Sequence, residues 1–175
     1  MLALIAAALL LVPTAAAARP AHHAQSSPCA GAAERRDAAR RAHAVRCLVN
    51  QARAAHGLRP LRENRALEIA AARHARDMVG RDFFGHTSPG GSTPSARARR
   101  AGYRGSVIGE TIAFAIGPDA TPAGTVRGWL RSSDHRTVLL APDLRDAGVG
   151  IADGAPLVAG AANDGETVVL DAGAR

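Results

Sequence analysis

The first half of the chain has apolar residues at the spacing of amphipathic helices. Between residues 34 and 56 they recur every three or four positions, which predicts a helix, and Gly57 is a natural residue to end it. Asn64 can cap a second helix. The buried stripe predicted for this second helix consists of Leu67, Ala70, Ala71, His74 and Met78.

Two Thr-Pro pairs mark further helix starts, because Thr is a good N-cap and Pro is favoured at the first helical position. They lie at 93–94 and 121–122, and Gly102 is expected to end the helix that follows the first pair. Ser132 or Ser133 can cap one more helical turn. Between these helices, residues 107–116 are predicted to form a strand or an extended segment.

The end of the chain has the pattern of short strands separated by turns. Asp-Gly pairs at 153–154 and 164–165 are typical of hairpin turns. The strands predicted around them are 147–152, 156–162 and 167–171. Helices followed by an antiparallel meander indicate the α+β class, and the number of helices favours an α-β-α sandwich with a small antiparallel sheet.

The N-terminus has the layout of a secretory signal. Residues 1–18 contain an apolar run, a Pro and then small residues, with a possible cleavage site at 16–18. Residues 19–41 are expected to form a flexible segment and the start of the first helix, before a domain at 42–172. We therefore expect a secreted or extracytoplasmic protein, although a leader that is retained as an anchor stays open.

The net charge of +7 is unevenly distributed, and all 22 basic residues are Arg. Residues 35–104 hold 16 Arg and five acids, whereas residues 105–175 hold five Arg and nine acids. An anionic partner, such as a lipid headgroup or a cell-envelope polymer, fits the basic half, as does a merely solvated helix surface. Nucleic acid is not expected, since only 3% of the residues are aromatic and no recognition motif is present.

Cys29 and Cys47 are the two cysteines of the chain. In an exported protein an even pair is most simply a disulfide, which here would tie the N-terminal segment to the first helix. Two free thiols or a metal-binding pair are the alternatives, and a lone pair 18 residues apart suits a metal poorly.

Five segments in order resemble the bacterial branch of the CAP superfamily, the SCP domains of cysteine-rich secretory, antigen 5 and pathogenesis-related 1 proteins. They read LVNQARAAHGLRPL at 48–61, LEIAAARHARDM at 67–78, FFGHTSPGG at 83–91, IGETIA at 108–113 and WLRSSDHRTVL at 129–139. The resemblance implies an α-β-α sandwich with a polar cavity. The cavity residues that it assigns are His86, Glu110 and His135, and the family's second acid has no match at 122–133.

Two imidazoles and a carboxylate are suitable ligands for a divalent metal such as zinc, although no cofactor is certain. Bound metal would support hydrolysis, and without it Glu110 could hold one His as an acid–base pair. The three side chains could equally form a structural hydrogen-bond network. A serine nucleophile is not indicated, because Ser88 lies in a turn and no nucleophile elbow exists.

The sequence therefore predicts a secreted CAP domain that binds a ligand, a lipid or the cell envelope and is more plausibly not an enzyme. A metal-dependent hydrolase acting on envelope or extracellular material is the alternative. A monomer is expected. The fold by itself does not decide between these functions.

Overall fold

The computed structural model describes residues 29, 37–160 and 164–174. The predicted leader at 1–18, and all of 19–36 except Cys29, lie outside the described residues. The elements in chain order are α1 (Ala38–Ala55), β1 (Arg62–Glu63), α2 (Arg65–Gly80), α3 (Pro94–Arg100), β2 (Ser106–Ile116), a 3-10 turn (Gly117–Asp119), α4 (Pro122–Arg131), α5 (Ser133–Leu139), β3 (Asp146–Asp153) and β4 (Gly165–Ala174).

The helices begin where the sequence places their caps. Asn64 accepts hydrogen bonds from the backbone N–H groups of Ala66 and Leu67, and Thr93 and Thr121 cap α3 and α4 ahead of their prolines. Gly57 follows α1 with a φ of +67°, a left-handed conformation that glycine adopts without strain. These caps confirm the predicted helix starts.

The sheet is mixed and has the strand order β1-β3-β4-β2. The pairs β3–β4 and β4–β2 are antiparallel, as predicted, while the two-residue β1 pairs with β3 in parallel. β1 lies between the first two predicted helices, in a stretch for which the sequence predicts no strand. The strand predicted at 156–162 is wrong over 156–160, where turns form instead, and 161–162 lie outside the described residues.

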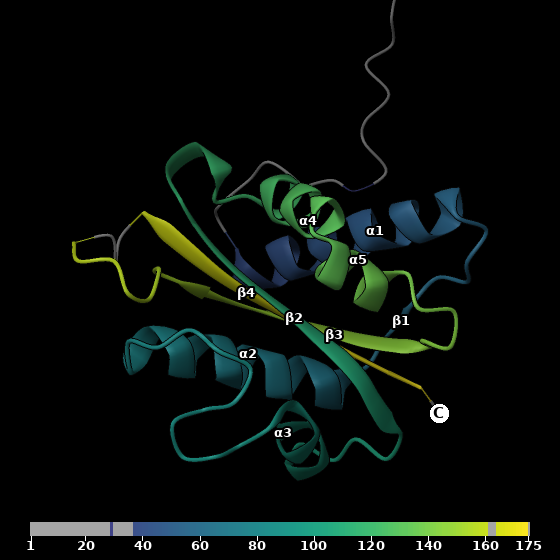
Figure 1. The fold of residues 1–175 in the computed structure, drawn as a ribbon, viewed down its shortest axis with the longest axis horizontal. Helices are drawn as coiled ribbons and strands as arrows, with labels where there is room; N and C mark the ends of the chain where they lie inside the picture. The colour runs from purple at the N-terminus through teal and green to yellow at the C-terminus, as the bar shows by residue number, and fades with distance from the viewer. Residues whose placement is uncertain (1–28, 30–36, 161–163, 175) are drawn as a thin grey trace, which may run out of the picture.

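Three layers make up the α+β fold, as Figure 1 shows. Helices α1, α4 and α5 lie on one face of the sheet, and α2 and α3 lie on the other. The larger core cluster lies between the sheet and the layer formed by α1, α4 and α5. It contains Val45, Val49, Leu61, Val126, Trp129, Leu139, Leu144, Ala147, Val149, Ile151, Val168, Leu170 and Ala172. Burial of this apolar surface is the main force that holds the layers together.

The other layer depends on close contact between α2 and β3. Gly148 and Gly150 lie where a Cβ atom would come within about 2.0 Å of α2 backbone atoms, at Glu68 and Ala72 respectively. Only glycine lets a helix backbone approach a strand this closely. The glycines of the AGVGIA segment therefore fix the position of α2, which carries His74.

Cys29 and Cys47 form the expected disulfide, with an S–S distance of 2.03 Å.

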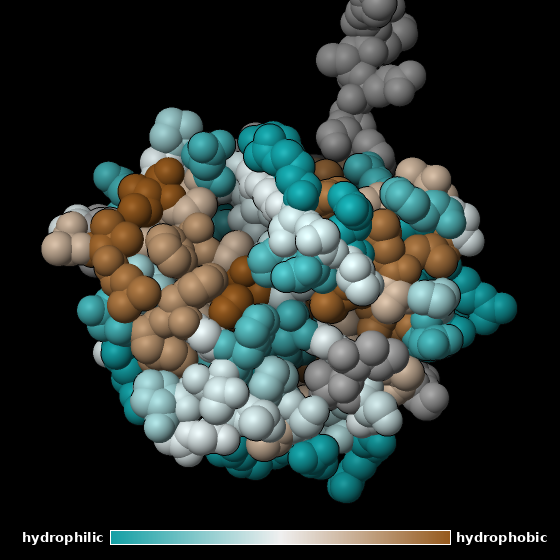
Figure 2. Space-filling model, viewed as in Figure 1, coloured by the Kyte–Doolittle hydropathy of each residue, from teal (hydrophilic) through white to brown (hydrophobic). Residues whose placement is uncertain are grey.

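Among the described residues, no helix combines the length and the apolar character that a membrane crossing needs. In Figure 2, apolar residues gather at the end of the molecule where β2 ends and the β3–β4 connection lies. The large hydrophobic residues exposed in the described part of the chain are Phe84, Ile116 and Leu157.

Candidate functional site

Glu110 lies at the centre of a polar cluster in the α2–α3 side of the sheet. It belongs to β2, and only 7% of the residue is exposed. His86 donates its Nδ1–H to Oε1 of Glu110 at 2.8 Å, and the Arg97 Nη2 donates to Oε2 at 2.5 Å. Both carboxylate oxygens are thus bound by cationic or ring N–H donors.

Arg97 binds Glu110 from α3, and the sequence did not mark it as a site residue. It is 9% exposed and comes from α3, and its Nη1 also donates to the backbone oxygens of His86 and Ser92. A buried guanidinium is planar, always charged and rigid, so it both neutralises Glu110 and fixes the 85–92 loop. Its place in an Arg-rich helix gave no signal that separated it from the surface arginines of that helix.

The charges and hydrogen bonds in this cluster shift the pKa values of Glu110 and His86. Burial alone would raise the pKa of Glu110, but the hydrogen bond from His86 and the charge of Arg97 outweigh it, so that the pKa lies below its ordinary value. The hydrogen bond to Glu110 raises the pKa of His86. Glu110 is therefore ionised, and its charge favours the protonated form of His86.

Asp171 of β4 is a second buried acid, and it pairs with Glu110 in the β2–β4 register. Among the described residues, its two oxygens have no hydrogen-bond donor. Burial raises the pKa of Asp171 well above its ordinary range, and the charge of Glu110 raises it further. Asp171 is therefore the acid of this pair that keeps its proton to the higher pH.

The resemblance left the second acid of the family unmatched at 122–133, and Asp171 occupies a different place in the chain. No local pattern reveals it, because two residues 61 positions apart meet only through strand register. Alternation along a buried strand would have been the only available signal, and it predicts a face but not a partner.

His74 of α2 completes the inner side of the cluster. The ring donates from Nε2 to the backbone oxygen of Gly85 at 2.9 Å and lies 4.0 Å from Oε1 of Glu110. Burial lowers its pKa, so the ring is neutral. Its Nδ1 has no hydrogen-bond partner among the residues that the structure describes. The interpretation of His74 as a packed, hydrogen-bonded residue of the buried stripe fits this position.

His135 stands apart from the other two predicted cavity residues. It belongs to α5 and lines a hollow of about 300 Å³ with Trp129 and Phe114. Burial lowers the pKa of His135, and the charge of His86 lowers it further. The described residues contain no hydrogen bond between His135 and either His86 or Glu110.

The fit of a metal to these residues is poor as they stand. Within residues 29, 37–160 and 164–174, no three His, Cys, Asp or Glu side chains converge as a metal-ligand set. Arg97 already supplies the positive charge at Glu110 that a cation would supply. Zinc at His86, Glu110 and His135 therefore stays a prediction of the resemblance, and no chemical step is derived from it.

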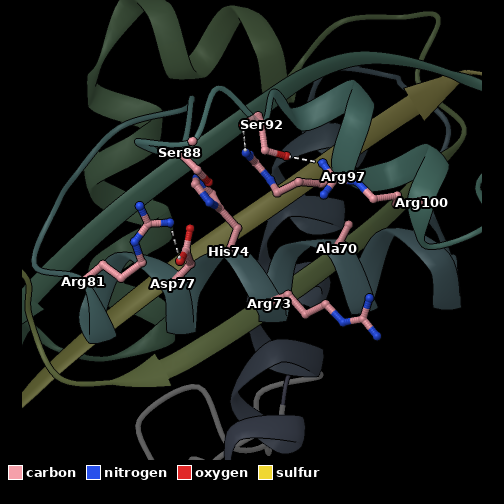
Figure 3. A pocket seen from close by; sticks show the side chains of 10 residues that line it. Ala70, Arg73, His74, Asp77, Arg81, Ser88, Ser92, Arg97 and Arg100 are labelled. Carbon is pink, nitrogen blue, oxygen red and sulfur yellow. Dashed lines mark hydrogen bonds and ion pairs between the residues drawn. The ribbon is translucent and has the colours of Figure 1, made fainter.

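A cavity of about 420 Å³ lies beside this cluster, between α2, the 85–92 loop and α3. Figure 3 shows Arg97 and Arg100 on one wall and His74, Asp77 and Arg81 on the other, with Ser88 and Ser92 above. The cavity shares Arg97 and His74 with the Glu110 cluster. Any ligand held there would contact groups that are linked directly to the predicted site.

Comparisons with known proteins agree with this fold. Solved structures with the same fold include an extracellular protein containing a SCP domain from Bacillus anthracis str. Ames, with a TM-score of 0.63 and 22% identity over 79% of this chain and 41% of that one. Another is an outer surface protein from Borrelia burgdorferi, with a TM-score of 0.58 and 22% identity over 75% of this chain and 90% of that one.

Two curated relatives come from Bacillus subtilis (strain 168). The uncharacterized protein YkwD is 32% identical over 103 residues, and the uncharacterized membrane protein YlbC is 33% identical over 106 residues. Each match covers 59% of this chain, but only 39% of YkwD and 29% of YlbC. The model of the cysteine-rich secretory protein family, CAP, matches residues 47–167. That match spans more than half of the chain, which therefore belongs to the CAP family of cysteine-rich secretory proteins.

Proposed function

We propose that this chain is a secreted binding module that holds a ligand of the bacterial cell envelope and does not catalyse a reaction. The observation that carries the proposal is the engagement of Glu110, whose two oxygens are bound by His86 and Arg97. A general base must lie within hydrogen-bond reach of the proton that it abstracts, and the side chain of Glu110 is only 1% exposed. We therefore assign Glu110 a structural role, in which it holds the 85–92 loop in place through His86 and Arg97.

Location outside the cytoplasm is the second part of the proposal. The predicted leader and the Cys29–Cys47 disulfide both fit an oxidising compartment. The names of the similar proteins describe one as extracellular and one as an outer surface protein. Since the cell envelope is the material such a protein meets first, it is the ligand source that we favour.

Binding can be tested by sedimenting the full chain with an isolated bacterial envelope fraction, before and after treatment with a chelator. We expect saturable binding that the chelator leaves unchanged, with no release of soluble fragments from the envelope. A protein that stays in the supernatant at every envelope concentration would contradict the proposal.

A metal-dependent hydrolase is the second candidate, and one observation favours it. His86 donates from Nδ1 to a carboxylate while half of its side chain is exposed, an arrangement that often orients histidine ligands of metals. In this alternative His86 and His135 would be the nitrogen ligands, and the metal would supply an activated water. Fragment release that zinc restores and His86→Ala abolishes would establish this alternative and overturn the first proposal.

A further inference from the structure

We propose that the arginine-lined cavity between α2 and α3 binds a phosphate group. This inference rests on the proposed binding function and deepens it, because it names the chemical class of the ligand. The cavity, of about 420 Å³, is large enough for a phosphate ester rather than for a bare ion alone. Its lining comes from α2, the 85–92 loop and α3.

The charge of the cavity wall is the first argument. Four arginines line it, namely Arg73, Arg81, Arg97 and Arg100, against the single acid Asp77. Asp77 lies 3.4 Å from Arg81, and Glu110 behind the wall pairs with Arg97. Within the described part of the chain, Arg73 and Arg100 have no carboxylate partner. Two uncompensated positive charges match a phosphate monoester, which carries close to two negative charges at neutral pH.

The rigidity of the wall is the second argument. Arg97 is held by the backbone oxygens of His86 and Ser92 and by Glu110, so its guanidinium is positioned before any ligand arrives. Arg100 donates to the hydroxyl of Ser92 and is steadied from the same loop. Guanidinium groups fixed in this way bind phosphate through paired N–H donors at a small entropic cost.

An unsatisfied donor in the wall also favours an anionic ligand. Among the described residues, the Nε of Arg97 is buried and has no hydrogen-bond partner. Buried polar groups usually find a partner, and a polar ligand or a water in the cavity would provide one. An apolar ligand would leave this N–H unpaired, and a carboxylate has too few oxygens to use all the donors of the wall.

Calorimetric titration of the full chain tests the inference, with inorganic phosphate, glycerol 3-phosphate and acetate as probes. The cavity variant is Arg73→Ala with Arg100→Ala, and the matched control is Arg76→Ala with Arg99→Ala, which removes exposed arginines of the same two helices outside the cavity. We expect phosphate and its ester to bind, with affinity reduced roughly tenfold or more in the cavity variant and unchanged in the control.

Two results would overturn the inference: acetate binding as tightly as phosphate, or an equal loss of affinity in both variants. A further arm with phosphatidylglycerol vesicles distinguishes the source of the phosphate. Vesicle binding that is lost in the cavity variant alone assigns a lipid headgroup. Binding of glycerol 3-phosphate without binding of vesicles assigns a soluble or polymeric phosphate ester.

The envelope sedimentation assay separates this inference from the proposed function. If the cavity variant binds envelope as well as the wild-type chain does, phosphate recognition fails while envelope binding stands. If the wild-type chain does not bind envelope, the proposed function fails, and the phosphate titration still decides whether the cavity holds an anion.

Discussion

Glu110 on β2 and Asp171 on β4 lie opposite each other across an antiparallel strand pair, and both are buried. Two ionised carboxylates at such a position would repel each other strongly. Arg97 and His86 stabilise the charge on Glu110, so Asp171 is the acid of the pair that keeps its proton to the higher pH. While Asp171 keeps it, the carboxyl pair holds one negative charge, which faces the Arg97 guanidinium.

Replacement of Asp171 by Asn tests this proton assignment. Because the folded pKa of Asp171 is raised, the wild-type acid stabilises the fold at acidic pH and loses that contribution as the pH rises toward the folded pKa. Asn donates a hydrogen bond to Glu110 at every pH. The free energy of unfolding, measured with urea at several pH values, should therefore increasingly favour Asp171→Asn as the pH rises above about 4. An Asp171→Asn difference that is flat with pH, or one that the exposed control Asp143→Asn matches, would contradict the assignment.

Replacement of Glu110 by Gln should destabilise the fold by about 3 kcal/mol, because it leaves the buried Arg97 without its counter-charge. Denaturant unfolding measures this loss. The matched control is Glu63→Gln, which removes the exposed acid of the Arg46 pair and should cost less than about 1 kcal/mol. Equal effects of the two substitutions would show that Glu110 is not the anchor of the cluster.

The same Glu110→Gln variant should lower the pKa of His86, since the hydrogen bond to Glu110 is what raises it. In the wild-type chain a raised histidine pKa adds stability at low pH that is lost as the pH rises through the folded pKa. Ring-proton NMR titration of His86 in both proteins measures the change. An unchanged midpoint would mean that the hydrogen bond between His86 and Glu110 is absent in solution.

Gly150→Ala tests the contact between β3 and α2. A Cβ atom at this position would lie 2.0 Å from the backbone nitrogen of Ala72, so the helix must move away from the sheet. We expect a loss of about 3 kcal/mol in the free energy of unfolding. Gly128→Ala in the exposed part of α4 is the control, because nothing lies within 4 Å of the added Cβ and the change should stabilise by about 1 kcal/mol. A Gly150→Ala protein as stable as the wild type would refute this close packing.

Reduction of the Cys29–Cys47 disulfide should lower the free energy of unfolding by about 3 kcal/mol, as expected for closure of a loop with a sequence separation of 18. Denaturant unfolding with and without reductant measures the effect. A Cys29→Ser and Cys47→Ser double variant should have the stability of the reduced protein and should not respond to reductant. Identical curves for the oxidised and reduced wild type would rule out a stabilising disulfide.

Local signals predicted the helices well, because caps act on the residues beside them. Asn64, Thr93 and Thr121 mark the starts of α2, α3 and α4 through bonds that span two or three residues. The strand predicted at 156–162 failed over 156–160 for the opposite reason. A short apolar run becomes a strand only when a partner edge is available, and β3 and β4 pair with each other past this connection.

The candidate site was predictable only in part. The resemblance assigned His86, Glu110 and His135 to one cavity. His86 and Glu110 are in direct contact, whereas His135 lines a separate hollow with Trp129 and Phe114. Arg97 and Asp171 escaped, although both determine the charge state of Glu110. One is an arginine among many, and the other meets Glu110 through strand register alone.

The sequence by itself determined the starts of α2, α3 and α4, the α+β class and the family, because each depends on local caps, periodicity or ordered motifs. Only the tertiary structure decided that Asp171 faces Glu110, that Arg97 neutralises it, and that arginines from α2 and α3 line one cavity. These relationships join residues far apart in the chain. Strand register and the packing of the layers determine these relationships, and no short sequence pattern reveals either of them.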